Sequence, residues 1–381
     1  MTPTPATRLR SIDALRGLVI LLMLLDHVRE TFYLHMQVSD PMDVAQTDPA
    51  LFFARSLAHL CASVFILLTG LSAFLYGEKH AGRGETSRFL LKRGLFLIVL
   101  EVTLVNFAWT FQFPPSVIYL QVIWAIGLSM VALSALLWLP RGWLVALGLA
   151  LIGGHNLLDG LHFPAESWLH VPWAVLHDRG WLEVSEQLRL RTSYPVLPWI
   201  GVIALGYAIG PWFARGSDAG QRQGRLLALG FTSLAVFFLL RLLNGYGEKP
   251  WHSDGATVQT LMSFFNITKY PPSLLFLALT LGVGLLLLAL LERRDGRVTD
   301  WLATFGAAPM FFYLLHLYVL KVLYIASLAA FGANHGEYFG FDSVLAVWIG
   351  AAVLAIALYL PVRAFARLKA RRRDIAWLKY F

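Results

Sequence analysis

Residues 272–291 have the sequence PSLLFLALTLGVGLLLLALL, a run of twenty residues without a charged side chain. A helix of this length rises about 30 Å, which matches the hydrocarbon core of a lipid bilayer. Apolar runs of 18 or more residues are typical of transmembrane helices and rare in soluble domains. The stretch therefore predicts an integral membrane protein.

The composition of the whole chain supports the same class. Of 381 residues, 57% are hydrophobic and only 14% are charged, whereas about 25% are charged in soluble proteins. The mean hydropathy of +0.63 is too high for one soluble core, because a large soluble surface must be wetted. Cys61 is the only cysteine, which excludes an intrachain disulfide and a thiolate zinc cluster. We expect no metal.

Ten segments are long and apolar enough to span a bilayer. We therefore predict an all-α, polytopic integral membrane protein with about ten transmembrane helices, which form a single domain over residues 1–381. The expected spans are residues 12–35, 51–76, 89–109, 117–139, 142–158, 195–214, 224–243, 272–291, 302–330 and 342–364.

Basic residues set the orientation of these spans. If the N-terminus is cytoplasmic, 21 of the 31 Lys and Arg residues lie on the inner side and five lie in outer loops. Because Lys and Arg collect on the cytoplasmic side, both termini are predicted to be cytoplasmic. The net charge of +8 then follows from topology. The basic run 371–373 is expected to bind anionic membrane lipid, and nucleic acid is not an expected partner.

Several ionisable residues fall inside the expected spans, where charge is costly and often functional. Counting 1.5 Å per helical residue places them in one layer just outside the midplane, which predicts a polar cavity open to the outer side. They are Asp26, His27, Arg55, His59, Glu101, Arg241, His316 and Lys321.

Structural roles are open for some of these residues. Asp26 and Arg29 are spaced i, i+3 and can pair, or Arg29 can extend to the outer headgroups. Glu101 can form an ion pair with Arg55 or Lys321 instead of binding a substrate.

The histidines are equally open to two explanations. One explanation for His316 is a purely structural role, in which it only packs against its neighbours. His27 follows Asp26, and a neighbouring carboxylate makes an imidazole more basic. Adjacent helical residues diverge by about 100°, however, so the two side chains need not touch.

Several short stretches carry a family resemblance. Residues 8–17 (RLRSIDALRG) and 23–29 (MLLDHVR) resemble the start of bacterial membrane proteins grouped with the heparan-alpha-glucosaminide N-acetyltransferase catalytic domain. The resemblance continues over nearly the whole chain. Further matching stretches are PALFFAR (49–55), HLCA (59–62), YP (194–195), PWIG (198–201), NGYG (244–247), NITKYPPS (266–273) and FYLLH (312–316).

The resemblance implies a transmembrane acyltransferase of the bacterial inner membrane. Such a protein would move an acetyl group from cytoplasmic acetyl-CoA to a sugar amine or hydroxyl on the far side. The resemblance to dimeric lysosomal relatives implies a homodimer. The histidine held responsible in those relatives aligns nearer His35 than His27, and the local sequence does not match, so no catalytic residue is carried over.

Acyl transfer needs a base or a nucleophile, and histidine suits either role because its pKa is near neutrality. We therefore predict His27 as the base, oriented by Asp26, with His59 or His316 as the second histidine. The residues predicted to bind the saccharide acceptor or its developing charge are Arg55, Glu101, Asn244, Tyr246, Asn266 and Lys269. The residues predicted to bind the CoA phosphates are Arg16, Arg88 and Arg93.

Two other functions compete with this one. A transporter could use Asp26, His27 and Glu101 for proton coupling, but the sequence has neither an inverted repeat nor a pair of Gly/Pro-broken helices. A membrane scaffold without catalytic activity would not need so many ionisable groups in one layer.

Overall fold

The computed structural model describes residues 9–80, 82–253, 255–372 and 374–380. Arg8 and Arg373, two of the basic residues assigned to the inner side, lie outside the described residues. The chain is mostly helical. Within the described residues, five helical segments are long and apolar enough to cross a membrane: Pro49–Lys79, Ala219–Leu243, Leu274–Leu291, Pro309–Phe331 and Val344–Arg371.

The longer elements follow the chain from end to end. The α-helices of the first half are α1 (Arg10–Phe32), α2 (Pro49–Leu57), α3 (Leu60–Lys79), α4 (Arg83–Leu100), α5 (Asn106–Thr110), α6 (Val122–Leu136), α7 (Arg141–Gly154) and α8 (His170–Leu176). Those of the second half are α9 (Leu197–Ile209), α10 (Ala219–Leu243), α11 (Thr257–Phe265), α12 (Leu274–Leu291), α13 (Arg297–Gly306), α14 (Pro309–Phe331) and α15 (Val344–Arg371).

Short elements connect or extend these helices. A π-helical segment, η1 (Glu101–Val105), joins α4 to α5. Three 3-10 helices are η2 (His155–Leu158), η3 (Gly210–Phe213) and η4 (Ala376–Tyr380). The strands are β1 (Val117–Leu120), β2 (Trp181–Ser185) and β3 (Leu188–Thr192).

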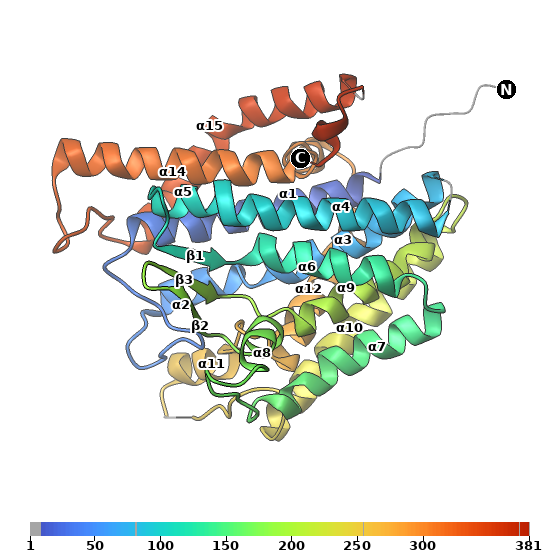
Figure 1. Cartoon of the computed structure of the whole chain (residues 1–381), viewed down its shortest axis with the longest axis horizontal. Helices are drawn as coiled ribbons and strands as arrows, with labels where there is room; N and C mark the ends of the chain where they lie inside the picture. Colours follow the sequence, from blue (N-terminus) through green and yellow to red (C-terminus); the bar gives the residue numbers. More distant parts are fainter. Residues whose placement is uncertain (1–8, 81, 254, 373, 381) are drawn as a thin grey trace.

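Most long helices run along the long axis of the molecule (Figure 1). The most extensive helix pairs are α1 with α13, α10 with α12, α3 with α9, α4 with α6, and α7 with α9. Each pair meets at glycines, where an added Cβ would collide with the partner helix, so the backbones approach closely. These glycines are Gly17 and Gly306, Gly230 and Gly282, Gly70 and Gly206, Gly94 and Gly127, and Gly148 and Gly201.

Several expected spans are interrupted in the structure. The expected span 51–76 is divided into α2 and α3, and the expected span 89–109 runs from α4 through η1 into α5. The expected span 302–330 is two helices, α13 and α14, interrupted at Ala307 and Ala308. Pro309 occupies the first turn of α14, where its missing N–H would be unpaired in any case. The expected span 117–139 begins with β1, and its helix starts only at Val122.

The predicted all-α class omits a small sheet, so it is wrong at this point. The strand order is β1-β3-β2, with β1 parallel to β3 and β2 antiparallel to β3. Residues 188–192 have the sequence LRLRT, an alternation with the period of two that suits a strand. Strands β2 and β3 lie in the segment 159–194, between two expected spans, and β1 lies just before α6; the helical periodicity describes neither part.

Candidate active site

A cavity of about 300 Å³ lies among α1, α3, α4, α6 and α14. One end, here called the basic end, is lined by Arg16, Arg93 and Lys369. The other, here called the aromatic end, is lined by Tyr194, Lys269 and Tyr270. Arg16 and His27 both line the cavity from α1, and their spacing corresponds to about 16 Å along the helix. The cavity therefore extends through much of the bundle.

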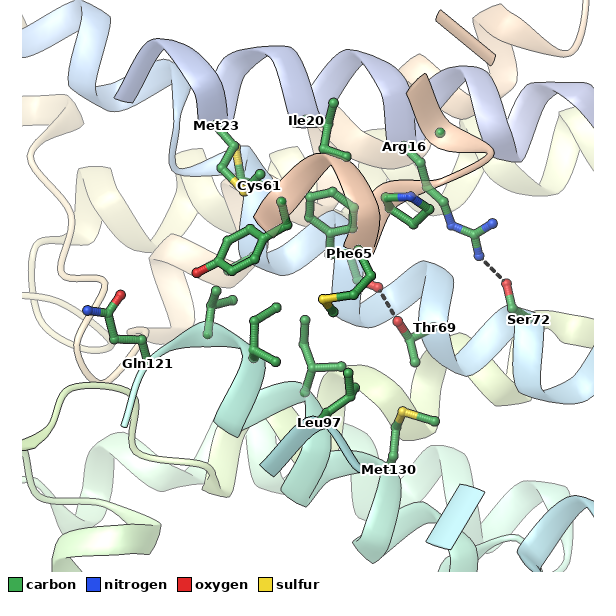
Figure 2. Close-up of a pocket in the computed structure, with 18 of the residues that line it drawn as sticks. Arg16, Ile20, Met23, Cys61, Phe65, Thr69, Ser72, Leu97, Gln121 and Met130 are labelled. Atoms are coloured by element: carbon green, nitrogen blue, oxygen red, sulfur yellow. Dashed lines mark hydrogen bonds between the residues drawn. The ribbon is translucent and has the colours of Figure 1, made fainter. Parts of the chain in front are cut away.

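The middle of the cavity is apolar. Figure 2 shows Ile20, Met23, Phe65 and Leu97 between Arg16 and Ser72 at one end and Gln121 at the other. Such a lining accepts an apolar chain, and the polar ends can bind charged or hydroxylated groups.

The basic end gathers cations from three parts of the chain. The Arg16 guanidinium donates to the Leu68 carbonyl at 3.3 Å and to the Ser72 hydroxyl. Lys369, near the end of α15, donates to the Ala307 carbonyl at 3.3 Å. The Arg93 guanidinium lies beside these groups in the cavity lining. Clustered Arg and Lys side chains favour phosphate groups.

Two histidines from α1 and α14 meet beside the cavity. His27 Nδ1 lies 2.7 Å from His316 Nε2, and His316 Nδ1 lies 2.7 Å from the Phe312 carbonyl oxygen. Since a carbonyl can only accept, His316 Nδ1 must carry a proton and, in a neutral ring, its Nε2 must accept. His27 Nδ1 then donates to His316, which leaves His27 Nε2 with a lone pair. Its nearest acidic neighbour is Glu30, whose Oε2 is 4.0 Å away.

Asp26 pairs with two arginines and not with His27, and one of these pairs is the i, i+3 pair with Arg29 that its spacing allowed. Arg29 Nε donates to Asp26 Oδ1 at 2.9 Å, and the Arg55 guanidinium contacts Asp26 Oδ2. All three side chains are buried. In the described part of the chain no hydrogen bond joins Asp26 to His27, because the two residues project from different sides of α1. His316 therefore takes the orienting place that the sequence assigned to Asp26.

The aromatic end is built around Lys269, which is buried. Its Nζ lies 5.2 Å from the centre of the Tyr270 ring and 5.7 Å from that of Tyr194, and the two tyrosine hydroxyls are 3.3 Å apart. Between α8 and β2, the Arg179 guanidinium lies 4.7 Å from the Tyr270 ring centre. A cation among aromatic faces suits a polar ligand with apolar faces.

Titratable groups also lie in the loops near this end. Asp40 accepts from the Lys269 backbone N–H at 3.1 Å, and burial raises the pKa of the Asp40 carboxyl. The His35 and His335 rings stack with centres 3.7 Å apart. Burial, and then the positive charge that His335 can carry, lower the pKa of His35, while Asp342 opposes this shift.

Several predicted residues lie outside the cavity lining, among them His59, Arg55 and Glu101. His59 is buried at the junction of α2 and α3, with its ring 5.2 Å from that of Phe276. Arg55 pairs with Asp26. Glu101 is buried at the start of η1 and accepts from the Trp124 backbone N–H at 2.9 Å. This bond satisfies an amide in the first turn of α6, so Glu101 serves as a helix cap.

The other residues predicted to bind the saccharide acceptor instead form hydrogen bonds with backbone carbonyls. Asn244 donates to the Trp251 carbonyl at 3.0 Å, and Asn266 donates to the Met42 carbonyl at 2.6 Å. The Tyr246 hydroxyl donates to the Gly153 carbonyl at 2.6 Å. These polar atoms hold loops and helix ends together and do not line the cavity. Arg88 also lies outside the lining, on an exposed face of α4.

Sequence reasoning missed Glu30, Tyr313 and Lys369, which line the cavity. Lys369 was assigned to the cytoplasmic tail as one of many basic residues. Tyr313 lies three residues before His316, which would place the two on one side of a helix. The ring centres of Tyr313 and His27 are 6.0 Å apart, so this spacing was a usable signal.

A family model describes the first part of this chain. The model of the heparan-alpha-glucosaminide N-acetyltransferase catalytic domain matches residues 8–241. The chain belongs to this family. Among the curated proteins, none matches the chain.

Membership in the heparan-alpha-glucosaminide N-acetyltransferase catalytic family indicates a membrane acetyltransferase. The matched region includes Arg16, His27 and Arg93. Residues 242–381, which follow the match, supply Lys269, Tyr313 and Lys369 to the lining of the same cavity, and His316 contacts His27 beside it. The cavity is therefore assembled from both parts of the chain.

Proposed function

We propose that the protein transfers an acetyl or similar acyl group from cytoplasmic acetyl-CoA to an extracytoplasmic saccharide amine or hydroxyl. In this proposal the chain crosses the bacterial inner membrane ten times with both termini in the cytoplasm. Five of the crossings are the helices with the required length and hydropathy. The excess of Lys and Arg in the segments expected to be cytoplasmic supports the orientation.

The observation that carries the proposal is one cavity with two chemically different ends. The basic end, with Arg16, Arg93 and Lys369, suits the phosphates of CoA. The apolar middle suits the acyl-carrying arm of CoA. The aromatic end, with Tyr194 and Tyr270, suits a sugar, which has both apolar faces and hydroxyl groups.

The chemistry would take place at His27. Its Nε2 removes a proton from the acceptor hydroxyl or amine as the acceptor oxygen or nitrogen attacks the thioester carbonyl carbon. The C–S bond then breaks, and the CoA sulfur leaves and receives that proton from the His27 imidazolium. Lys269 is placed to stabilise the negative oxygen of the tetrahedral intermediate. His316 positions the His27 ring through the 2.7 Å contact.

Acetyl transfer in purified membranes tests this proposal. Membranes from cells expressing the protein receive acetyl-CoA with a labelled acetyl group and a set of amino sugars and neutral sugars. We expect label to reach a sugar and His27→Ala to reduce turnover by about 10²–10⁴-fold, the usual contribution of a general base.

His252→Ala is the matched control, because this histidine is exposed in another outer loop. Near-normal turnover by His27→Ala would contradict the role of His27 as base. Uptake of a solute into proteoliposomes without CoA, together with no acetyl transfer, would favour a transporter instead.

A further inference from the structure

A second cluster of histidines lies away from the cavity, where α7 ends. His155 begins η2, Asp159 follows that helix, and His177 ends α8. Both imidazoles are only 2% exposed, whereas the Asp159 side chain is 52% exposed. One ligand atom from each of the three side chains lies within 4.8 Å of the other two. The three groups thus face a common point.

The two buried rings have few hydrogen bonds of their own. Neither nitrogen of His155 has a hydrogen-bond partner, and His177 Nδ1 also has none. The Pro272 carbonyl lies near the His155 ring, but the two do not form a hydrogen bond of ordinary geometry. A buried polar atom without a partner costs free energy. His177 Nε2 donates to the His155 backbone carbonyl at 3.1 Å, because a carbonyl can only accept. The buried nitrogens that call for a ligand are therefore those of His155 and His177 Nδ1.

Packing alone does not account for this arrangement. The His155 and His177 ring centres are 5.7 Å apart with their planes tilted by 55°, so the rings do not stack on each other. Trp173 stacks on His177, with ring centres 5.1 Å apart and planes 15° apart. This stacking covers one face of the His177 ring and leaves its nitrogens at the edge.

We propose that His155, Asp159 and His177 bind a first-row transition-metal ion of the zinc class, which replaces the expectation from the sequence that the chain binds no metal. Two imidazoles and one carboxylate form a ligand set that zinc prefers. Calcium and magnesium instead take oxygen ligands. The exposed side of Asp159 leaves room for water as a fourth ligand.

The carboxylate is already oriented for this role. Asn156 Nδ2 donates to Asp159 Oδ2 at 2.9 Å, while Asp159 Oδ1 lies 3.4 Å from His177 Nε2. Hydrogen bonds of this kind hold metal-binding carboxylates in place. Ligand atoms about 2.0–2.2 Å from zinc lie roughly 3.4 Å from one another in a tetrahedron. The three ligand atoms, which lie within 4.8 Å of one another, would therefore have to approach by no more than about 1.4 Å to bind zinc.

Such an ion would fasten the outer loop to the helix bundle. His155 and Asp159 belong to the end of α7, and His177 belongs to the loop that leads to the sheet. Arg179, two residues beyond His177, lies over Tyr270 at the aromatic end of the cavity. The metal would thus hold the loop that covers the aromatic end. This inference does not depend on the proposed acetyl transfer.

Metal binding by tag-free protein in detergent tests the proposal directly. The protein is stripped with EDTA and titrated with Zn²⁺ against a chromogenic chelator, and Co²⁺ serves as a spectroscopic probe. We expect one Zn²⁺ per chain and the strong visible bands of tetrahedral Co²⁺. We also expect Zn²⁺ to raise the thermal midpoint of unfolding, because the ion binds only the folded chain.

Variants identify the ligands. We expect His155→Ala and His177→Ala to weaken Zn²⁺ binding by at least about tenfold and to abolish the Co²⁺ bands. Asp159→Asn should do the same and should fold normally, since its side chain is exposed, so it decides the question if the histidine variants fail to fold. His162→Ala, at a 68% exposed side chain in the same loop, is the control that should bind as the wild type does.

Two results would overturn the proposal. The first is wild-type protein that binds less than one Zn²⁺ per chain. The second is Zn²⁺ affinity that is the same in the wild type, Asp159→Asn and any folded histidine variant.

Discussion

His27 Nδ1 lies 2.7 Å from His316 Nε2, and this contact joins residues 289 positions apart in the chain. It links α1, within the family match, to α14, which lies beyond the match. Because the Phe312 carbonyl fixes the proton on His316 Nδ1, the neutral pair has one consistent arrangement of protons. That arrangement leaves the lone pair on His27 Nε2, as a general base requires.

The first prediction concerns His316. Replacing it by Ala removes the acceptor for His27 Nδ1, so the His27 ring can rotate and exchange tautomers. We expect kcat for acetyl transfer to fall by about 10²-fold, within the range of general base catalysis, and KM for acetyl-CoA to stay unchanged. Steady-state kinetics in proteoliposomes measures both. His316→Gln, whose side-chain oxygen can still accept, should recover part of the activity.

Equal losses in His316→Ala and His316→Gln, with KM raised in both, would indicate that His316 serves only in packing. His59→Ala provides a second comparison, because His59 is also buried but packs against Phe276, whereas His316 contacts His27. We expect it to reduce kcat much less than His316→Ala does.

The second prediction concerns the buried ion pairs of Asp26. Removing one partner of a buried pair leaves an uncompensated charge and typically costs about 3–5 kcal/mol. We therefore expect Asp26→Asn to lower the thermal midpoint of the detergent-solubilised protein clearly, since Arg55 loses its carboxylate partner and Arg29 keeps only the more exposed Glu30. Glu30→Gln is the control, because the Glu30 side chain is 36% exposed. A smaller shift for Asp26→Asn than for Glu30→Gln would contradict the structural role.

The third prediction concerns the basic end of the cavity. Lys369→Ala should raise KM for acetyl-CoA about tenfold, the low end for a hydrogen bond to a charged group, with kcat unchanged. Arg88→Ala is the matched control, because Arg88 is exposed and lies outside the cavity lining. If Lys369→Ala and Arg88→Ala have the same KM for acetyl-CoA, Lys369 does not bind the CoA phosphates.

The helices were largely predictable because long apolar runs carry a strong signal. The interruption between α13 and α14 was not predictable, since the sequence on both sides of it is apolar and only Pro309 marks the boundary. The sheet was also missed, because β2 and β3 lie in a segment between two expected spans, where a helical pattern gives no signal. Short strands depend on their partners, and β3 pairs with β1 some 70 residues earlier.

The site was predictable only as a set of candidates. Costly polar groups in apolar helices identified His27 and His316, but depth along a helix does not determine which side chains meet. Family-like motifs also identified Asn244 and Asn266, which bind backbone carbonyls. A motif marks a polar residue without telling whether it faces a ligand or the chain itself.

The fourth prediction concerns the contact between α1 and α13. A Cβ at Gly17 would collide with the Leu302 carbonyl, so Gly17→Ala should destabilise the protein by about 1–3 kcal/mol, as overpacking does. Gly84→Ala is the control, because a Cβ there meets nothing within 4 Å and Ala favours a helix by up to about 1 kcal/mol. Thermal unfolding in detergent compares the two. Equal midpoints would contradict the close approach of α1 and α13.

The fifth prediction concerns pH and the His35–His335 stack. Burial, and then the positive charge that His335 can carry, lower the pKa of His35 in the folded protein, with Asp342 opposing. The unfolded chain therefore binds more protons below pH of about 6.5, the ordinary value for histidine. Stability is then fully present above that pH and falls as the pH drops toward the folded pKa. We expect the thermal midpoint to fall between pH 7 and pH 5, and to fall less in His35→Gln. His252→Gln, at an exposed position, should retain the wild-type slope, whereas an unchanged slope in His35→Gln would contradict a role for the stack.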